Sequence, residues 1–254
     1  MAWNPDTYNK FKAERYAPFY DLLSLIKVRP GLSVIDMGCG TGELTRLLAD
    51  HLPGSIVSGI DSSPEMLEEA ASFSNTQVTF FCKTIQEQIG DGTKWDLVFS
   101  HAALQWVDNH RQLLKDIISI ISEGGQLAVQ VPSNHDHFTH VFLHELALQN
   151  PYKEALEGWV RKIPVLTITE YADIFFEGGG KDITVFEKVY PHILKDANSL
   201  YDWVSGTAML RYMDRLPDEF KDSFKKDYKK KLIDEFKNTP VFYPFKRIIM
   251  TATF

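Results

Sequence analysis

Residues 34–42 read VIDMGCGTG, an apolar run that leads directly into a glycine-rich turn. The run carries one acid, Asp36, and the turn places glycine at alternate positions, Gly38, Gly40 and Gly42. A helical pattern follows, so the order is typical of a buried strand, a tight turn and the N-terminus of a helix. Glycine lets a ligand approach the backbone closely, and a helix N-terminus offers free N–H groups. We expect this loop to hold a nucleotide-like or zwitterionic ligand.

A second acid strengthens that expectation. Asp61 ends the next short apolar run, and it stands roughly 20 residues beyond the glycine turn, where an acid at a strand tip binds the hydroxyls of a ribose. A glycine turn that merely folds a helix back on a strand is the alternative, but it does not account for the paired acid. The two features together predict a ligand that carries adenosine.

The spacing of the glycines selects among adenosine cofactors. Dinucleotide folds use G-x-G-x-x-G, whereas this loop reads G-x-G-x-G with an acid inside the strand, which speaks against a nicotinamide oxidoreductase. The loop resembles the glycine-rich motif of class I S-adenosylmethionine-dependent methyltransferases. The resemblance implies that Asp36 lies near the methionine amino group, that Gly38 and Gly40 pack on the cofactor, and that Asp61 binds the ribose.

Composition and charge limit the other functions that the chain could have. It has 254 residues, of which 44% are hydrophobic and 24% charged, values that are ordinary for a globular protein. The net charge of −7 gives no general affinity for nucleic acid. No run is apolar enough to span a membrane, and Cys39 and Cys82 form neither a disulfide framework nor a metal motif. We expect a protein of the reducing cytoplasm, and the sequence leaves its oligomeric state open.

The order of predicted elements indicates a doubly wound α/β fold. Five apolar runs, beginning at the glycine loop and ending at residues 126–131, alternate with helical patterns, which predicts a Rossmann-like and mostly parallel sheet. Strands at 183–194 and 242–254 would complete seven strands, with the antiparallel pair at the sheet edge that class I methyltransferases carry. We expect one domain over residues 1–254 with helical insertions at about 133–165 and 197–240. Further helices are predicted at residues 3–30, 200–216 and 218–236, and the segment 133–165 is predicted to be mostly helical.

The class I resemblance also implies roles for residues at the ends of the other strands. Thr84 stands where this fold usually places an acid that binds the adenine amino group, so we expect backbone groups or a neighbouring side chain to serve there. Tyr8 and Arg15, on the N-terminal helix, are further candidates for contact with the cofactor. The remaining candidates for the cofactor site are Cys39, Ser62, Met66, Ile85, Ser100 and His101.

Six stretches of the chain make the resemblance more specific. They are WNPDTYNKFKAER, GIDSSPEML, LQWVDNH, GGQLAVQVPSN, YADIF and YDWVSGTAMLR, which run along nearly the whole sequence. Together they resemble the trans-aconitate 2-methyltransferase family, which makes a monomethyl ester of a small tricarboxylate. The sequence also lacks the Asn/Asp-Pro-Pro-Tyr/Phe signature of enzymes that methylate adenine or glutamine amides. Ser100, in place of an acid, argues against a magnesium-dependent catechol enzyme.

A carboxylate acceptor needs positioning rather than a catalytic base, because it is ionised at pH 7. Arg211 matches the arginine of the family and is suited to a carboxylate by its bidentate fork, although pairing with Asp214 is the alternative. The other expected acceptor contacts are Gln105, Trp106 and Tyr212, followed by His101 and Trp203. The alternatives for the function are another small acid, an acyl-chain carboxylate, a phenolic acceptor with His101 as base, and a non-catalytic protein that keeps the fold.

Four histidines within ten positions, His135, His137, His140 and His144, raise the alternative of a zinc site. No cysteine or suitably spaced glutamate supports a metal there. We therefore expect these histidines to line a helix or the edge of a pocket, and we predict no metal.

Overall fold

The computed structural model describes the backbone of residues 12–254 and the side chains from residue 16 onward. The described chain forms two compact units. Unit 1 takes residues 12–14, 133–163 and 189–246, and unit 2 takes residues 15–132, 164–188 and 247–254. Both segments that the sequence suggests as helical insertions fall almost wholly within unit 1.

A seven-stranded sheet organises unit 2. Its order is β3-β2-β1-β4-β5-β7-β6, with parallel pairing from β3 through β5 and antiparallel pairing between β5 and β7. The predicted doubly wound sheet with an antiparallel pair is therefore confirmed. The strands are β1 (Ser33–Met37), β2 (Ile56–Asp61), β3 (Val78–Cys82), β4 (Trp95–His101), β5 (Ile121–Pro132), β6 (Lys181–Leu194) and β7 (Val241–Thr253).

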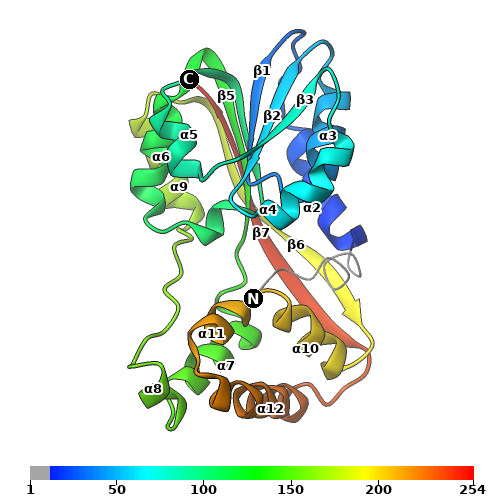
Figure 1. Ribbon diagram of the computed structural model, residues 1–254, viewed down its shortest axis with the longest axis vertical. Coiled ribbons are helices and arrows are strands. Elements are labelled where there is room, and N and C mark those ends of the chain that lie inside the picture. The colour runs from blue at the N-terminus through cyan, green and yellow to red at the C-terminus, as the bar shows by residue number, and fades with distance from the viewer. Residues whose placement is uncertain (1–11) are drawn as a thin grey trace. The chain divides into compact units, whose positions relative to one another are not determined.

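Helices cover both faces of this sheet, as the crossovers between parallel strands require. One face carries α2 (Lys12–Leu23), α3 (Glu43–His51) and α4 (Pro64–Ala70), and the other carries α5 (Ile85–Gly90), α6 (His110–Ser119) and α9 (Ile168–Glu177) (Figure 1). Because β1 and β4 are covered on both faces, their apolar runs are buried almost end to end.

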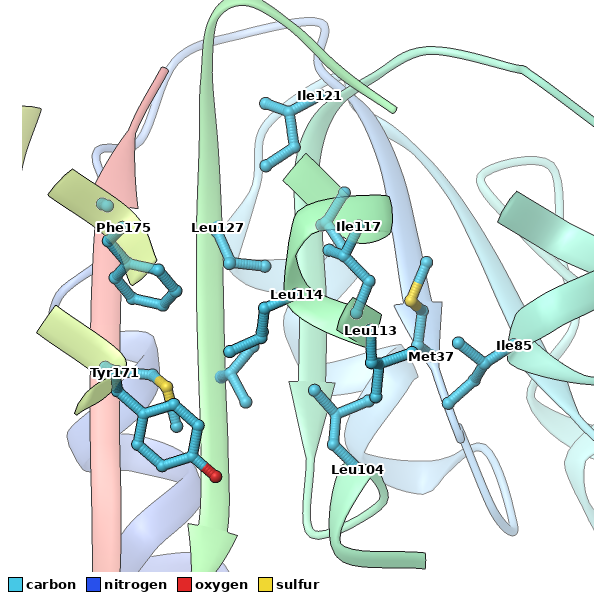
Figure 2. Packing of buried hydrophobic residues seen from close by; sticks show 14 of the residues in the cluster. Met37, Ile85, Leu104, Leu113, Leu114, Ile117, Ile121, Leu127, Tyr171 and Phe175 are labelled. Carbon is cyan, nitrogen blue, oxygen red and sulfur yellow. The ribbon is translucent and has the colours of Figure 1, made fainter. Parts of the chain in front are cut away.

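The main core of unit 2 lies between the sheet and the second group of helices. Figure 2 shows Leu113, Leu114 and Ile117 of α6 beside Leu127 of β5 and Tyr171 of α9. Leu113 and Leu114 lie four and three residues before Ile117, about one helical turn, so the three form a single buried face. This core fixes the positions of the strand ends from which the functional side chains project.

Unit 1 is helical and has an aromatic core of its own. Its helices are α7 (Phe138–Ala147), α8 (Tyr152–Ala155), α10 (Ala197–Ser205), α11 (Leu210–Arg215) and α12 (Asp218–Glu235). Phe224 and Tyr228 of α12 are fully buried, and the Phe224 ring lies 5.0 Å from the ring of Tyr152. Tyr228 also donates to the backbone oxygen of Thr139 at 2.9 Å, which ties α12 to α7.

Three predicted elements are wrong in extent. The predicted helix at 200–216 is two helices, α10 and α11. The chain leaves α10 at Gly206, and the backbone N–H groups of Thr207 and Met209 both bond the Val204 carbonyl oxygen instead of the oxygen four residues back. The helix α2 ends at Leu23 rather than near residue 30, and tighter turns at residues 24–26 follow it. Of residues 133–165, only α7 and α8 are helical.

Candidate functional site

The glycine-rich loop joins β1 to α3 at the carboxyl ends of the parallel strands, where ligands of open α/β sheets bind. The backbone N–H groups of Gly38 and Cys39 both donate to the Ile60 carbonyl oxygen, at 2.8 and 2.9 Å. Gly42 then caps α3 with φ +78°, a left-handed conformation that favours glycine. The loop is thereby fastened to the end of the neighbouring strand β2.

Asp61 links the glycine-rich loop to the residues that begin α4. Its Oδ2 accepts from the backbone N–H of Gly40 at 3.0 Å, and its Oδ1 accepts from the N–H of Ser63 at 2.9 Å. An ionised carboxylate has about four acceptor positions, so these two bonds leave one position on each oxygen. That geometry suits two neighbouring hydroxyl groups.

Asp36 is buried below the loop, and its carboxyl group is held by a contact that the sequence did not suggest. The hydroxyl of Thr45, on α3, donates to Asp36 Oδ2 at 2.6 Å. Burial raises the pKa of Asp36 to about 7; the Thr45 hydrogen bond opposes this shift and the nearby charge of Asp61 adds to it. The apolar pattern of this helix predicts that Leu44, Leu47 and Leu48 face inward. Leu48 is buried as predicted, together with Thr45 and Ala49, whereas Leu44 and Leu47 are only partly buried.

Two glycines of the loop differ in the space around them. A Cβ added at Gly38 would lie 2.2 Å from the Cβ of Ala103, so the loop after β4 packs directly on this glycine. A Cβ added at Gly40 would meet no atom of the described residues within 4 Å, although φ is +55°. The backbone at Gly40 therefore borders open space, as a loop that receives a cofactor requires.

These two positions give a matched pair of substitutions. Gly38→Ala must move Ala103 and adopt a left-handed backbone, so we expect it to lower the free energy of unfolding by about 3 kcal/mol or more. Gly40→Ala meets only the backbone strain of about 1 to 2 kcal/mol, but its methyl group enters the open space. We expect thermal unfolding to show the larger loss for Gly38→Ala. Titration with S-adenosylmethionine should show weakened binding for a folded Gly40→Ala protein, and unchanged binding would contradict a cofactor at this glycine.

The ends of β2 and β3 supply the other side of the candidate cofactor site. Met66 and Ile85 are buried at the starts of α4 and α5, with side chains 8% and 9% exposed. Ser62 is exposed beside Asp61. Thr84 caps α5, and its hydroxyl takes part in a capping box with Glu87, so this side chain is already engaged in ending the loop.

The loop after β4 begins with two residues of the predicted cofactor set. The hydroxyl of Ser100 is buried and donates to the Met37 carbonyl oxygen at 2.7 Å, which joins β4 to β1. The His101 ring lies edge-on to the ring of Phe19 at 5.8 Å between centroids. Tyr8 and the side chain of Arg15, also suggested for this site, lie outside the part that the structure describes.

Gln105 and Trp106 follow in a short 3₁₀ turn, η2 (Leu104–Trp106). The Gln105 amide donates to the Ala102 carbonyl oxygen at 2.6 Å, and Trp106 is partly exposed. Ala102 has φ +55°, a left-handed value that is uncommon for a residue with a side chain. The loop therefore holds a defined and locally strained conformation.

A buried histidine that the sequence did not single out holds this turn in place. The ring of His110 bonds the Leu104 carbonyl oxygen through Nε2 at 2.9 Å and the Tyr171 hydroxyl through Nδ1 at 2.5 Å. A carbonyl oxygen only accepts, so Nε2 carries the proton and Tyr171 donates to Nδ1. The Tyr171 hydroxyl in turn accepts from the N–H of Leu166 at 3.2 Å. Burial lowers the pKa of His110, which favours this neutral form.

The remaining predicted acceptor residues belong to unit 1. Arg211 is exposed on α11, whereas Tyr212 beside it is buried, with its ring 5.4 Å from Trp159 and 5.7 Å from Phe224. Trp203 is buried on α10 and lies 4.7 Å from the His192 ring.

The histidine cluster of unit 1 forms a packed hydrogen-bond group. Thr139 Oγ1 lies 3.0 Å from Nδ1 of His137 and 3.1 Å from Nδ1 of His140. Burial is the main cause that lowers the pKa of His140 to about 3, and the charge of Arg161 adds to it. Among the side chains that the structure describes, from residue 16 onward, no three His, Cys, Asp or Glu groups are arranged so that they could hold a metal ion.

Gln130 and Arg247 are two further buried polar residues that the sequence analysis missed. Gln130 is fully buried on β5 and Arg247 is 4% exposed on β7. Gln130 interrupts the apolar run at residues 127–131, and that interruption is the signal that could have pointed to it. Arg247 follows Lys246 in the sequence and has no such signal.

Comparison with known proteins indicates the same class of protein as the fold and the glycine-rich loop do. A family model described as a methyltransferase domain matches residues 8–185. A Bacillus subtilis protein of known structure covers 94% of this chain and 98% of its own, with a TM-score of 0.60 and 14% identity. A phosphoethanolamine N-methyltransferase of Haemonchus contortus, solved with S-adenosylmethionine, covers 94% of this chain and 52% of its own, with a TM-score of 0.53 and 16% identity. The structural likenesses show the fold alone.

The sheet order, the glycine loop with Asp61 and the matched domain together define an S-adenosylmethionine-dependent methyltransferase of class I. Trans-aconitate 2-methyltransferase of Deinococcus radiodurans is 42% identical over all of this chain and 98% of its own. The Mycobacterium tuberculosis protein of the same name is 33% identical over 98% of this chain and 96% of its own. The chain belongs to the trans-aconitate 2-methyltransferase family.

Proposed function

We propose that this protein transfers the methyl group of S-adenosylmethionine to a carboxylate of trans-aconitate or a closely related small polycarboxylate. The observation that carries the proposal is the 42% identity with a relative of that name over the whole chain. We place the reaction in the cytoplasm, where Cys39 and Cys82, both free thiols, would stay reduced.

The residues around the glycine loop fit the cofactor by their chemistry. We assign the two remaining acceptor positions of Asp61 to the ribose hydroxyls, and the open space at Gly40 to close contact with the cofactor. Asp36, buried beside the loop, supplies negative charge for the methionine ammonium group. The bound cofactor supplies an electrophilic methyl group on a sulfonium, which an oxygen nucleophile displaces in line.

The other residues of the predicted cofactor set have supporting roles. Met66 and Ile85 offer apolar surface to the adenine ring, and Cys39 lines the loop as a small neutral side chain, because burial raises the pKa of its thiol. Because the Thr84 hydroxyl is engaged with Glu87, we assign recognition of the adenine amino group to backbone atoms. The remaining members are Ser62, Ser100 and His101.

For the acceptor, we propose that the chain positions a nucleophile that is already ionised. A carboxylic acid has a pKa near 4, so no side chain has to remove a proton at pH 7. Gln105 and Trp106, on the turn held by His110, shape the acceptor site of unit 2. For Arg211 of unit 1 we propose a role in carboxylate recognition, because its guanidinium can bind a carboxylate through two hydrogen bonds. Tyr212 supports Arg211 from the core of unit 1.

Transfer of labelled methyl groups to a panel of acids tests this proposal. We expect strong labelling of trans-aconitate, weak labelling of monocarboxylates and none of phenols. With saturating cofactor, the rate should stay flat above pH 6, because the nucleophile is ionised throughout that range. A rise in rate with a pKa near that of histidine would instead favour a phenolic acceptor with His101 as base.

A further inference from the structure

Gln130 and Arg247 form a buried polar pair inside unit 2. They come from the neighbouring antiparallel strands β5 and β7, where Arg247 stands opposite Pro132 and Gln130 opposite Ile249. Arg247 Nη1 donates to the amide oxygen of Gln130 at 3.1 Å. Gln130 is fully buried and Arg247 is 4% exposed, so the pair lies within the protein.

The pair lies at the ligand-binding edge of the sheet. Gln130 stands two residues before the end of β5 and pairs with His101, the last residue of β4. The N–H of Ala102 donates to the Gln130 backbone oxygen at 2.9 Å, so Gln130 adjoins the loop that carries Gln105 and Trp106. Ligands of open α/β sheets bind outside these carboxyl ends.

The hydrogen-bonding state of Gln130 points to a missing acceptor. Its amide nitrogen is buried and has no hydrogen-bond partner in the part of the chain whose side chains the structure describes, residues 16–254. Buried amide donors are normally satisfied, so one that is not needs an explanation.

A second glutamine on the same strand shows what a purely structural role looks like. Gln126 lies four residues earlier on β5, and it is 6% exposed. Its oxygen accepts from the N–H of Lys27 at 3.0 Å, and its nitrogen donates to the Leu25 carbonyl oxygen at 3.2 Å. Both ends of the Gln126 amide are therefore used, unlike those of Gln130.

We propose that Gln130 and Arg247 bind a carboxylate of the methyl acceptor, an inference that rests on the function proposed above. The Gln130 amide nitrogen donates to one carboxylate oxygen, and the Arg247 guanidinium supplies the opposite charge and a planar set of donors. An ionised carboxylate accepts both, because its two oxygens offer about four acceptor positions. This assigns acceptor recognition to a strand pair of unit 2.

The substitution Gln130→Glu tests this role with almost no change in volume. Its carboxylate would take the place of an oxygen already bonded to Arg247, so the new ion pair should keep or raise the thermal midpoint. The same negative charge would repel an acceptor carboxylate. We expect the dissociation constant of trans-aconitate, measured by calorimetry with S-adenosylhomocysteine present, to rise about 100-fold. Binding of S-adenosylmethionine should not change.

Gln126→Glu is the matched control, because it makes the same change on the same strand. It breaks the bond to the Leu25 carbonyl oxygen, so we expect a lower thermal midpoint and an unchanged dissociation constant for trans-aconitate. Arg247→Lys keeps the charge and loses the planar donor set, and we expect about a tenfold weaker binding of trans-aconitate.

The outcomes separate the two proposals. If the wild-type protein methylates trans-aconitate and Gln130→Glu binds it as tightly as the wild type, the pair is structural and this inference is wrong. If the wild type binds S-adenosylhomocysteine but neither binds nor methylates any carboxylate, the proposed function fails and takes this inference with it. Weakened trans-aconitate binding in Gln130→Glu alone, with an intact thermal midpoint, supports both.

Discussion

Asp61→Ala is expected to weaken S-adenosylmethionine binding by at least about 100-fold, because hydrogen bonds to a charged group contribute about 1.5 to 3 kcal/mol each and two ribose hydroxyls would lose theirs. The carboxylate also holds the N–H groups of Gly40 and Ser63. The variant therefore loses both a ligand contact and the support of the glycine loop. Calorimetric titration of the purified protein measures the change in the dissociation constant.

A control is needed, because Asp61→Ala also removes structural hydrogen bonds. Asp96 offers a matched position: its Oδ2 accepts from the N–H of Ser33 at 2.9 Å and from the Ser33 hydroxyl at 2.8 Å, at the opposite end of β1 from the glycine loop. Asp96→Ala should lower the thermal midpoint and leave cofactor binding unchanged. Equal weakening of cofactor binding in both variants would show that Asp61 acts through stability rather than through the ribose.

Asp36→Asn is expected to change how the stability of the ligand-free protein depends on pH. The carboxyl pKa is about 7 in the folded protein, against 3.8 as its ordinary value. Between these values only the folded state holds the proton, so the free energy of unfolding falls as pH rises from about 4 to about 7. Asp36 contributes a loss of about 4 kcal/mol over that window. Asp36→Asn should lack this loss, and denaturant unfolding at pH 4.5 and pH 7.5 measures it.

The same substitution tests the proposed contact with the methionine ammonium group. If the cofactor binds the ionised form of Asp36, wild-type affinity should rise roughly 20-fold between pH 5.5 and pH 7.5. Asp36→Asn should bind more weakly at pH 7.5 and show no such dependence. Thr45→Val, which removes the hydrogen bond that lowers this pKa, should shift the transition to higher pH. A wild-type affinity that is independent of pH would remove Asp36 from the ammonium site.

The sheet was predictable because its signals are local and repeated. Asp36, the glycine turn and Asp61 mark two consecutive strand ends, and right-handed crossovers then determine the neighbours of β1. The family followed from motifs spread along the whole chain, and the full-length relatives confirm it. The break between α10 and α11 falls at Gly206, a residue type that commonly ends helices, but the apolar periodicity across residues 200–216 does not register it.

The supporting contacts of the site were harder to predict, because they join residues that are far apart in sequence. Tyr171 reaches His110 across 61 positions, and Arg247 reaches Gln130 across 117. A histidine in a helix or a glutamine in a strand has no local pattern that reveals such a partner. Gly38 in the sequence correctly predicted the turn. It did not predict that Ala103 packs against this glycine, because that contact is visible only in the folded structure.

The position of β7 has a consequence for how the chain is made. β7 follows every other strand in sequence, yet it lies between β5 and β6 in the sheet. Until residues 241–253 have been synthesised, β5 lacks the strand that pairs with its outer edge, and β6 lacks the strand that joins it to the sheet. The order of synthesis therefore leaves a long apolar strand edge unpaired until late, when chaperones or premature release of the chain would matter most.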